Sequence, residues 1–242
     1  MYKTQDRNGR LLLYKEPKGP SDVIAQRNEI ECLSLLSKSA HIITFHGVVV
    51  SQTPYQTDPG RVSGLVIRGF LTDYAIRGSL SRVLDEEPGC GWNQRISWGL
   101  QIAKGLRDIH DAHLSHVDLN SNNVVIDEHN NAFIIDLSRT VRTYGWCAPE
   151  AWVETDPLDL PLEAMQRADI YSLGVVLWEL ATGYKVVIPI GMDHEEFFKI
   201  EDGLVPKEYE QMVHRCLKST PGDRPEIREI IQMLVKLRTD SA

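Results

Sequence analysis

The stretch H-V-D-L-N-S-N-N, residues 116–123, decides how this chain is interpreted. It places Asp118 and Asn123 five residues apart in a short polar segment. Eighteen residues after Asp118, the apolar run Ile134-Ile135 ends at a second aspartate, Asp136. Such side chains can surround one pocket, in which Asn123 and Asp136 suit magnesium ions that carry a nucleoside triphosphate. Asp118 then suits a base that orients a hydroxyl nucleophile.

The composition is that of a globular protein with a substantial core. The chain has 242 residues, of which 42% are hydrophobic and 25% charged, enough for one large domain or two small lobes around a cleft. Its formal net charge is −8, from 26 lysines and arginines against 34 aspartates and glutamates. This balance argues against non-specific binding to nucleic acid and against a polybasic membrane patch.

Cysteine usage and hydropathy indicate where the protein resides. The four cysteines lie far apart and form no C-x-x-C pair, which predicts free thiols in a reducing compartment. The N-terminus is polar and shows no signal peptide. The most apolar stretch, residues 171–181, is too short to span a bilayer and contains Glu179. We therefore expect a cytoplasmic or nuclear protein without membrane insertion.

The first part of the chain predicts strands and one helix. A polar loop of Gln, Thr, Pro, Asp and Gly, residues 51–63, separates two strand-like runs and is longer than a tight hairpin needs. The predicted elements are a strand at Leu11–Lys15, a loop at 17–20, a helix capped by Ser21 or Asp22 with Ile24, Ile30, Leu33 and Leu36 on its apolar face, and strands at 42–50 and 64–71.

From Trp92 onward the helical period dominates. One helix carries Trp98, Ile102, Leu106 and Ile109 at helical spacing. Two further helices are predicted, one opened by Asp169 and ended by Thr182-Gly183, and an amphipathic one at 226–237. The layout is α+β, with a small strand-rich part and hinge at residues 1–74 and a larger helical part at 75–242.

Motifs in a fixed order resemble the eukaryotic protein-kinase family over residues 10 to 237. The catalytic-loop pattern H-R-D-L-x-x-x-N is followed by D-F-G, and this chain has similar runs at 116–123 and 136–138. Further matches are A-P-E at 148–150, D-x-x-S-x-G at 169–174 and G-D-R-P at 222–225. The W-C-A-P-E run, residues 146–150, and the hinge are closest in style to tyrosine kinases and tyrosine-kinase-like kinases.

The resemblance implies a bilobal kinase-like fold that binds ATP and Mg²⁺ and acts on, or binds, another protein. Its catalytic residues would be Asp118, Lys15 and Glu29, with Lys15 pairing the nucleotide phosphates and Glu29 holding that lysine. Metal ligands would be Asn123 and Asp136. The nucleotide would also contact Leu13, Thr72 as gatekeeper, the hinge backbone of Asp73, Tyr74 and Ala75, and Val125.

The same resemblance implies structural roles for other polar residues. Glu150 and Arg224 would form an ion pair within the helical lobe. Three histidines, residues 110, 113 and 116, follow helical spacing and have an alternative reading as a metal site. The family instead places His116 in an apolar spine between the lobes, which Leu33, Phe45 and Leu137 complete.

The N-terminal end departs most from the family pattern. Only fourteen residues precede Lys15, with the single glycine Gly9, where a kinase has two strands and a G-x-G-x-x-G loop over the phosphates. We interpret this as a truncated, reduced N-lobe that lacks the glycine-rich lid. Leu13 replaces the family's small alanine and adds three carbons against the base, which narrows the pocket.

The catalytic loop and the segment after it differ as well. Val117 replaces the arginine that commonly receives an activation-loop phosphate, and Asn120 replaces the lysine of serine/threonine kinases. Only thirteen residues separate Asp136 from Glu150, and Ser138 replaces the D-F-G glycine. A loop this short leaves little to order by phosphorylation.

Three functions remain open from the sequence. The first is a protein kinase, of weak activity, that transfers the γ-phosphoryl group of ATP to a protein hydroxyl, with serine/threonine or tyrosine specificity unresolved. The second is a pseudokinase that acts as an interaction or allosteric module, as the absent lid, Leu13 and Asn120 suggest. The third is a small-molecule phosphotransferase, against which the A-P-E and G-D-R-P runs speak. Retention of all five polar catalytic residues favours the first.

Overall fold

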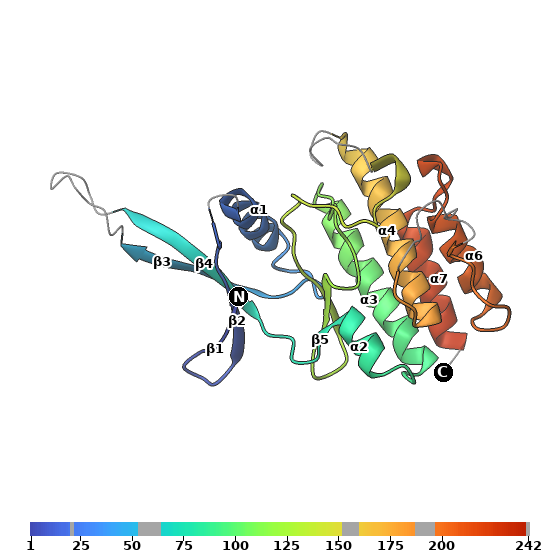
Figure 1. The fold of residues 1–242 in the computed structure, drawn as a ribbon, viewed down its shortest axis with the longest axis horizontal. Helices are drawn as coiled ribbons and strands as arrows, with labels where there is room; N and C mark the ends of the chain where they lie inside the picture. The colour runs from blue at the N-terminus through green and yellow to red at the C-terminus, as the bar shows by residue number, and fades with distance from the viewer. Residues whose placement is uncertain (20–21, 53–63, 152–159, 187–196, 241–242) are drawn as a thin grey trace.

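The chain folds into a small sheet with one helix and a larger helical part (Figure 1). The computed structural model describes residues 1–19, 22–52, 64–151, 160–186 and 197–240. In Figure 1 the sheet and α1 lie on the left and the helical bundle on the right. The predicted α+β bilobal architecture is confirmed. The boundary at residue 74 stays a prediction, although the chain does leave the sheet after Asp73.

The small part is a four-stranded antiparallel sheet in the order β1-β2-β4-β3. Its elements are β1 (Tyr2–Gln5), β2 (Leu11–Lys15), α1 (Asp22–Leu35), β3 (Phe45–Gln52) and β4 (Leu65–Asp73). The predicted strand at Leu11–Lys15 is confirmed. The strand predicted from residue 42 begins at Phe45, because Ile42 forms only an isolated bridge to Ile134. Outside the described residues lie Pro20, Ser21 and residues 53–63, which make up most of the loop predicted at 51–63.

Strand β1 is an element that apolar patterning missed. All four of its residues are exposed, so no alternation marks it. The signal that predicts it is the Asn8-Gly9 turn, a common hairpin connection, in which Gly9 has φ +85°. The strand pairs with β2 in register, and the stacked rings of Tyr2 and Tyr14, with centroids 6.3 Å apart, lie on one face of the pair.

The apolar face predicted for α1 is partly wrong. Leu33 and Leu36 are buried as expected, but Ile24 is 67% exposed. The buried residues of the helix include Gln26 and Glu29, which face the sheet beside Lys15. The inner face of this helix is partly polar, because it contributes Glu29 to an ion pair as well as apolar residues to the core. Apolar spacing alone therefore predicts the wrong residues for this face.

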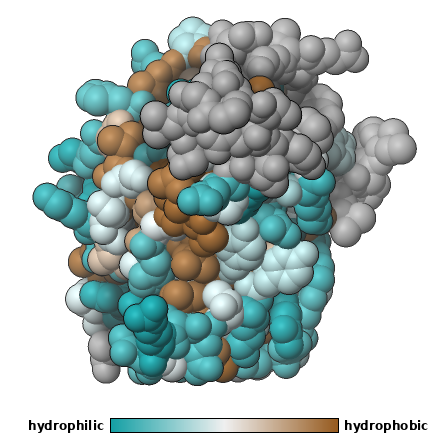
Figure 2. Space-filling model, turned by 90° about the vertical axis from the view of Figure 1, so that its left-hand side faces the viewer, coloured by the Kyte–Doolittle hydropathy of each residue, from teal (hydrophilic) through white to brown (hydrophobic). Residues whose placement is uncertain are grey.

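The β3–β4 hairpin extends beyond α1 at the left of Figure 1. Apolar side chains remain exposed along it, with Val48 41%, Val50 44%, Ile67 50% and Leu65 69% exposed. Figure 2, which views the molecule from this end, shows hydrophobic surface gathered into a stripe.

The helical part packs around two long helices, α3 and α4. Its elements are β5 (Gly78–Ser79), α2 (Leu80–Glu86), α3 (Trp92–Asp111), β6 (Val124–Ile126), β7 (Ala132–Ile134), the short 3₁₀ turns η1 (Pro149–Ala151) and η3 (Pro221–Asp223), α4 (Leu162–Thr182), α6 (Lys207–Cys216) and α7 (Ile227–Asp240). The second sheet has the order β5-β6-β7. The polar loop of the first motif directly precedes β6, and β7 is the strand before Asp136.

The core predicted for α3 and the end predicted for α4 are confirmed, and the start predicted for α4 is wrong. All four core residues predicted for α3 are fully buried. Helix α4 ends as expected at Thr182, where Gly183 adopts φ +73° and its N–H donates to Glu179 O at 2.8 Å. It begins at Leu162, however, seven residues before the predicted start at Asp169. Asp169 therefore lies inside the helix and does not open it. Its carboxylate accepts hydrogen bonds from the backbone of a neighbouring loop.

All four cysteines are free thiols, as predicted. Over the described part of the chain, helices are too short or too polar to cross a membrane.

Candidate active site

Lys15, Glu29 and Asp136 form a cluster between the two parts. Lys15 Nζ lies 2.5 Å from Glu29 Oε2 and 3.6 Å from Asp136 Oδ2. Each residue comes from a different element, β2, α1 and the segment after β7, so the cluster exists only when sheet, helix and helical part are packed together. The lysine is thereby held with its ammonium between two carboxylates; its pairing with Glu29 was predicted from the sequence, and its contact with Asp136 was not.

The protonation of these carboxylates depends on burial and on Lys15. Burial raises the pKa of Glu29 to about 7, and the Lys15 ammonium opposes this rise. Burial would also raise the pKa of Asp136, but Lys15 and a hydrogen bond from Ser138 outweigh it and hold that pKa below its ordinary value. Asp136 is therefore ionised at neutral pH.

The polar loop between α3 and β6 holds Asp118 in a fixed orientation. Asp118 Oδ1 accepts a hydrogen bond from Thr143 N at 2.7 Å, and Asp118 Oδ2 accepts one from Asn123 Nδ2 at 3.1 Å. Burial raises the pKa of Asp118, and the contacts with Thr143 oppose that rise. A carboxylate with a raised pKa and a fixed geometry is suited to receive a proton.

Asn120 braces this loop, a role that sequence reasoning missed. Its side chain is buried, its Nδ2 donates to Asp118 O at 3.0 Å, and its Oδ1 accepts from Asn122 N at 2.9 Å and Asn123 N at 3.2 Å. All of these partners lie within the loop. Asn120 therefore replaces the expected lysine with a structural contact and supplies no charge to the cleft.

The buried Asp169 fixes the backbone that leads into Asp118. Its two oxygens accept hydrogen bonds from His116 N at 2.8 Å and Val117 N at 2.9 Å, and His110 Nε2 lies 3.0 Å away. Val117 has φ +74°, a costly conformation for a β-branched residue that these bonds hold in place. Because His110 contacts Asp169 and His116 Nε2 contacts Ile135 O at 3.0 Å, the two rings serve separate contacts. Within the described ranges the alternative histidine metal site is wrong.

The apolar spine predicted around His116 has the burial it requires. Leu33, His116 and Leu137 are almost completely buried, and Phe45 is half-buried against the same core. Leu33 and Leu137 belong to one hydrophobic core, against which Phe45 packs.

Asp136 has the features of a magnesium ligand. Ile135 N donates to Asn123 O at 2.9 Å, which places Asp136 beside Asn123. Within the described part of the chain, Asp136 Oδ1 is buried and has no hydrogen-bond partner. Such an unsatisfied buried oxygen is costly unless a ligand meets it. The amide nitrogen of Asn123 bonds Asp118, so its oxygen is the atom suited to a second metal contact. These residues fit a Mg²⁺ site.

The hinge segment presents backbone groups next to the cluster. Thr72 lies opposite Leu13 in the sheet, and Asp73 N and Tyr74 N already donate to Thr44 O and Leu11 O. The N–H of Ala75 is therefore the hinge donor suited to a base. Asp73 lies opposite Leu12, on the other face from Leu13, and its carboxylate contacts Arg10 and His46.

A cavity of about 520 Å³ lies along the hinge, and its lining includes Leu11, Tyr74 and Ala75 as well as Arg10, Asp73 and Glu128. Lys15, Asp118 and Asp136 do not line it. Because the side chain of Asp73 points to the face opposite Leu13, only its backbone can serve a nucleotide beneath Leu13.

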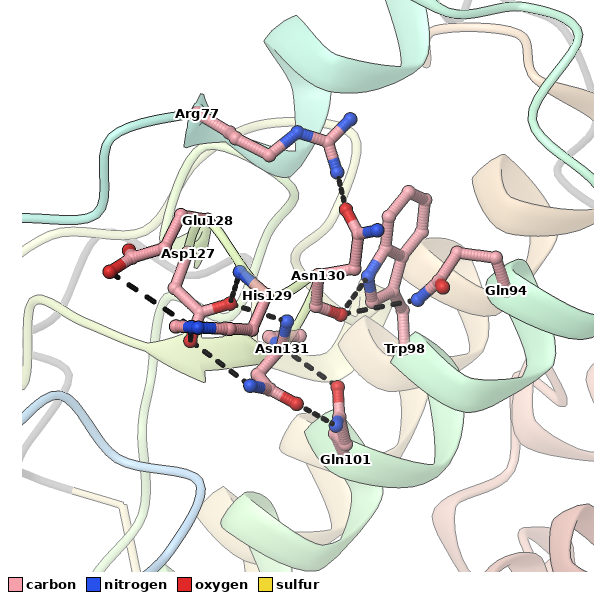
Figure 3. A network of polar contacts seen from close by, with 10 residues as sticks. Arg77, Gln94, Trp98, Gln101, Asp127, Glu128, His129, Asn130 and Asn131 are labelled. Atoms are coloured by element: carbon pink, nitrogen blue, oxygen red, sulfur yellow. Dashed lines mark hydrogen bonds and ion pairs between the residues drawn. The ribbon is translucent and has the colours of Figure 1, made fainter.

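The turn between β6 and β7 is anchored to α3 by the polar network of Figure 3. Asp127 accepts hydrogen bonds from the backbone of His129 and Asn131, while Trp98 Nε1 donates to Asn130 O at 2.9 Å. The anchored turn fixes Val125, which pairs with Ser79 and Phe133. Asp127, Glu128 and His129 place ligand atoms within 4.8 Å of one another, but the carboxylate of Asp127 is already used by the turn.

The predicted pair of Glu150 and Arg224 is confirmed. Arg224 Nη1 and Nη2 donate to Glu150 Oε1 at 2.5 Å and Oε2 at 2.8 Å, a bidentate contact. The arginine side chain is fully buried and the glutamate is 28% exposed. This pair joins η1 to the residue after η3 and lies outside the cluster around Lys15.

Comparison with known proteins agrees with this arrangement. Residues 13–234 match the family described as protein tyrosine and serine/threonine kinase. The chain therefore belongs to this protein kinase family. The matched range contains every residue of the Lys15 cluster and of the Asp118 loop.

Individual relatives are serine/threonine kinases by name. The chain is 29% identical over 191 residues to "Serine/threonine-protein kinase STY17" of Arabidopsis thaliana, covering 69% of this chain and 32% of that protein. It is 33% identical over 182 residues to "Probable serine/threonine-protein kinase DDB_G0268876" of Dictyostelium discoideum, covering 70% and 13%. It is 29% identical over 219 residues to "Probable serine/threonine-protein kinase PBL25" of Arabidopsis thaliana, covering 72% and 56%. The chain thus spans only part of each relative.

The buried carboxylate of Glu179, which contacts Ser121 in the Asp118 loop, should make the free energy of unfolding depend on pH. It accepts hydrogen bonds from Ser121 Oγ and Trp146 Nε1, and burial raises its pKa from 4.5 to about 7, against the effect of Lys185. The folded chain therefore binds more protons than the unfolded chain between these values. The resulting stabilisation is complete below pH 4.5 and is lost as the pH rises through 7.

We expect this group to lower the free energy of unfolding by about 3 kcal/mol between pH 4.5 and pH 8. Urea titrations across this range should show the loss in wild type. Glu179→Gln should remove that part of the slope, because glutamine can still accept from Trp146 and donate to Ser121 but does not ionise. Equal slopes in both proteins would show that Glu179 keeps an ordinary pKa.

Proposed function

We propose that this chain is a protein kinase domain that transfers the γ-phosphoryl group of ATP to a serine or threonine hydroxyl of another protein. The observation that carries the proposal is Lys15 held between Glu29 and Asp136, with Asp118 and Asn123 joined to Asp136 through Ile135. The choice of serine or threonine rests on the names of the relatives, which are serine/threonine kinases.

Each residue has a role that follows from its surroundings. Lys15 binds phosphate oxygens, and Glu29 and Asp136 keep its ammonium in place. Asp118, fixed by Thr143 and Asn123, orients the acceptor hydroxyl and takes its proton. Asp136 and Asn123 would hold Mg²⁺, which would supply positive charge to the phosphates when bound. Leu13, Val125 and Thr72, together with the backbone of residues 73–75, would contact the adenine base. Catalysis on this arrangement is mainly positioning and charge neutralisation.

A second candidate is a kinase-like interaction module without catalysis. The observation that favours it is Asn120, whose amide is consumed within its own loop, so the cation expected there is absent. Leu13 adds bulk on the cleft side of β2. Nucleotide binding and transfer separate the two candidates.

Replacing Asp136 with asparagine should remove the magnesium-dependent part of nucleotide binding. Among the described residues Asp136 Oδ1 has no hydrogen-bond partner, and the substitution removes the negative charge that a metal ion at this oxygen needs. With Mg-ATP at a hundredfold excess over Kd, wild type should gain about 2.7 kcal/mol of stability. The variant should show the same melting shift with Mg-ATP as with ATP and a chelator.

The matched control is Glu128→Gln, an exposed carboxylate outside the cleft, which should keep the full magnesium effect. A magnesium effect retained by Asp136→Asn would remove Asp136 from the metal site. Wild type that shows no shift with millimolar nucleotide would count against ATP binding as a whole.

A further inference from the structure

We propose that Lys3 and Tyr74 form a latch across the hinge side of the cleft, which weakens the binding of a nucleotide base. The inference rests on the proposed ATP site and concerns how access to it is controlled. It starts from the register of the sheet, which places Lys3 directly opposite Leu13, and Leu13 directly opposite Thr72.

Residues that are directly opposite each other in an antiparallel pair point to the same face. Lys3 therefore shares a face with Leu13, and Lys15, two residues along β2, shares it as well. The stacked rings of Tyr2 and Tyr14 mark the opposite face. Lys3 is thus part of the surface that covers the proposed base position, together with Leu13.

The ammonium of Lys3 does not extend freely into solvent. Its Nζ lies 4.8 Å from the centroid of the Tyr74 ring, within the range of a cation–π contact. Tyr74 belongs to the hinge, where its N–H donates to Leu11 O at 3.4 Å. The contact consequently connects strand β1 to the hinge, at the edge where a base would slide in beneath Leu13.

A base that takes up this position must displace the lysine stem or cover its ammonium. Displacement breaks the cation–π contact, and covering it removes water from a charge; both oppose binding. A contact of this kind at an exposed site changes an equilibrium by roughly two- to fivefold. The latch therefore adds to the bulk of Leu13 in lowering affinity for the base.

Calorimetric titration of the purified chain with adenosine and, separately, with Mg-ATP tests the latch. Lys3→Met keeps the length of the stem and removes the charge, and Tyr74→Leu removes the ring. Each should bind both ligands roughly two- to fivefold more tightly than wild type. Lys3→Arg keeps a cation at this position and should bind as wild type does. Melting curves establish that all variants are folded.

The double variant Lys3→Met with Tyr74→Leu should bind no more tightly than either single variant, because both remove one contact. Unchanged affinity in Lys3→Met would overturn the latch while leaving the proposed function intact. Weaker binding of Mg-ATP with unchanged binding of adenosine would also overturn it, since Lys3 would then attract phosphates. Failure of every variant to bind either ligand would overturn both the latch and the proposed ATP site.

Discussion

Arg224→Ala should lower the free energy of unfolding by about 3–5 kcal/mol, because it leaves Glu150 without its partner in a partly buried site. The arginine also donates to the backbone oxygens of Lys218 at 2.8 Å and Arg167 at 2.9 Å, and its guanidinium lies 5.2 Å from the ring of Tyr171. The substitution therefore leaves unsatisfied carbonyl groups and an empty volume as well as an unpaired charge. Denaturant titration and thermal melting measure the loss, which corresponds to a melting temperature lower by on the order of 10 °C.

The matched control is Arg228→Ala, on the following helix. Arg228 is 73% exposed and contacts Asp111 at 3.4 Å, so its loss should change stability by less than about 0.5 kcal/mol. Glu150→Gln tests the pair from the other side and should also destabilise. An Arg224→Ala variant as stable as the Arg228 control would mean that the ion pair does not form in solution.

The Glu150–Arg224 pair illustrates what motif order adds to local patterning. The two residues are 74 positions apart, and neither periodicity nor charge spacing links them. Their contact was predicted only because the A-P-E and G-D-R-P runs resemble those of protein kinases. By contrast, the core of α3 follows from helical spacing alone, because its apolar residues meet other apolar residues.

Errors in the sequence predictions occur where polar contacts replace apolar packing. Helix α1 buries Glu29 for Lys15 and leaves Ile24 exposed, so hydrophobic spacing misplaces its inner face. Helix α4 starts before Asp169. That aspartate lies inside the helix, where its carboxylate binds the backbone of the Asp118 loop. Strand β1 has no buried residue at all, and only the Asn-Gly turn marks it.

The candidate site was predictable as a set of residues but not as a set of contacts. The pairing of Lys15 with Glu29 was expected and is present, whereas the contact of Lys15 with Asp136 was not expected. The bracing role of Asn120 was not expected, because its amide bonds depend on the backbone of a loop whose conformation a one-dimensional pattern does not specify. Its signal in the sequence is the asparagine-rich run from 120 to 123, a composition that favours side-chain-to-backbone turns.

Asp118→Asn should abolish phosphoryl transfer, with a loss on the order of 100-fold or more in rate. Asparagine has the same shape and can still accept from Thr143 N, but it does not take a proton from an acceptor hydroxyl. The fold should survive, because Asp118 is only partly buried and lies outside the helical core. Incorporation of radiolabelled phosphate from ATP into a set of protein acceptors is the measurement, and melting curves check the fold.

A structural explanation for such a loss must be separated from a catalytic one. In wild type, Asn123 Nδ2 donates to Asp118 Oδ2 at 3.1 Å. Asparagine at position 118 can place an amide nitrogen there, so that two donors face each other. The double variant Asp118→Asn with Asn123→Asp restores a donor and an acceptor across this contact but leaves no carboxylate at position 118. If Asp118 acts as the base, the double variant stays inactive although its melting temperature recovers. Recovery of transfer in the double variant would reduce Asp118 to a loop contact, and the absence of transfer by wild type would favour the non-catalytic module.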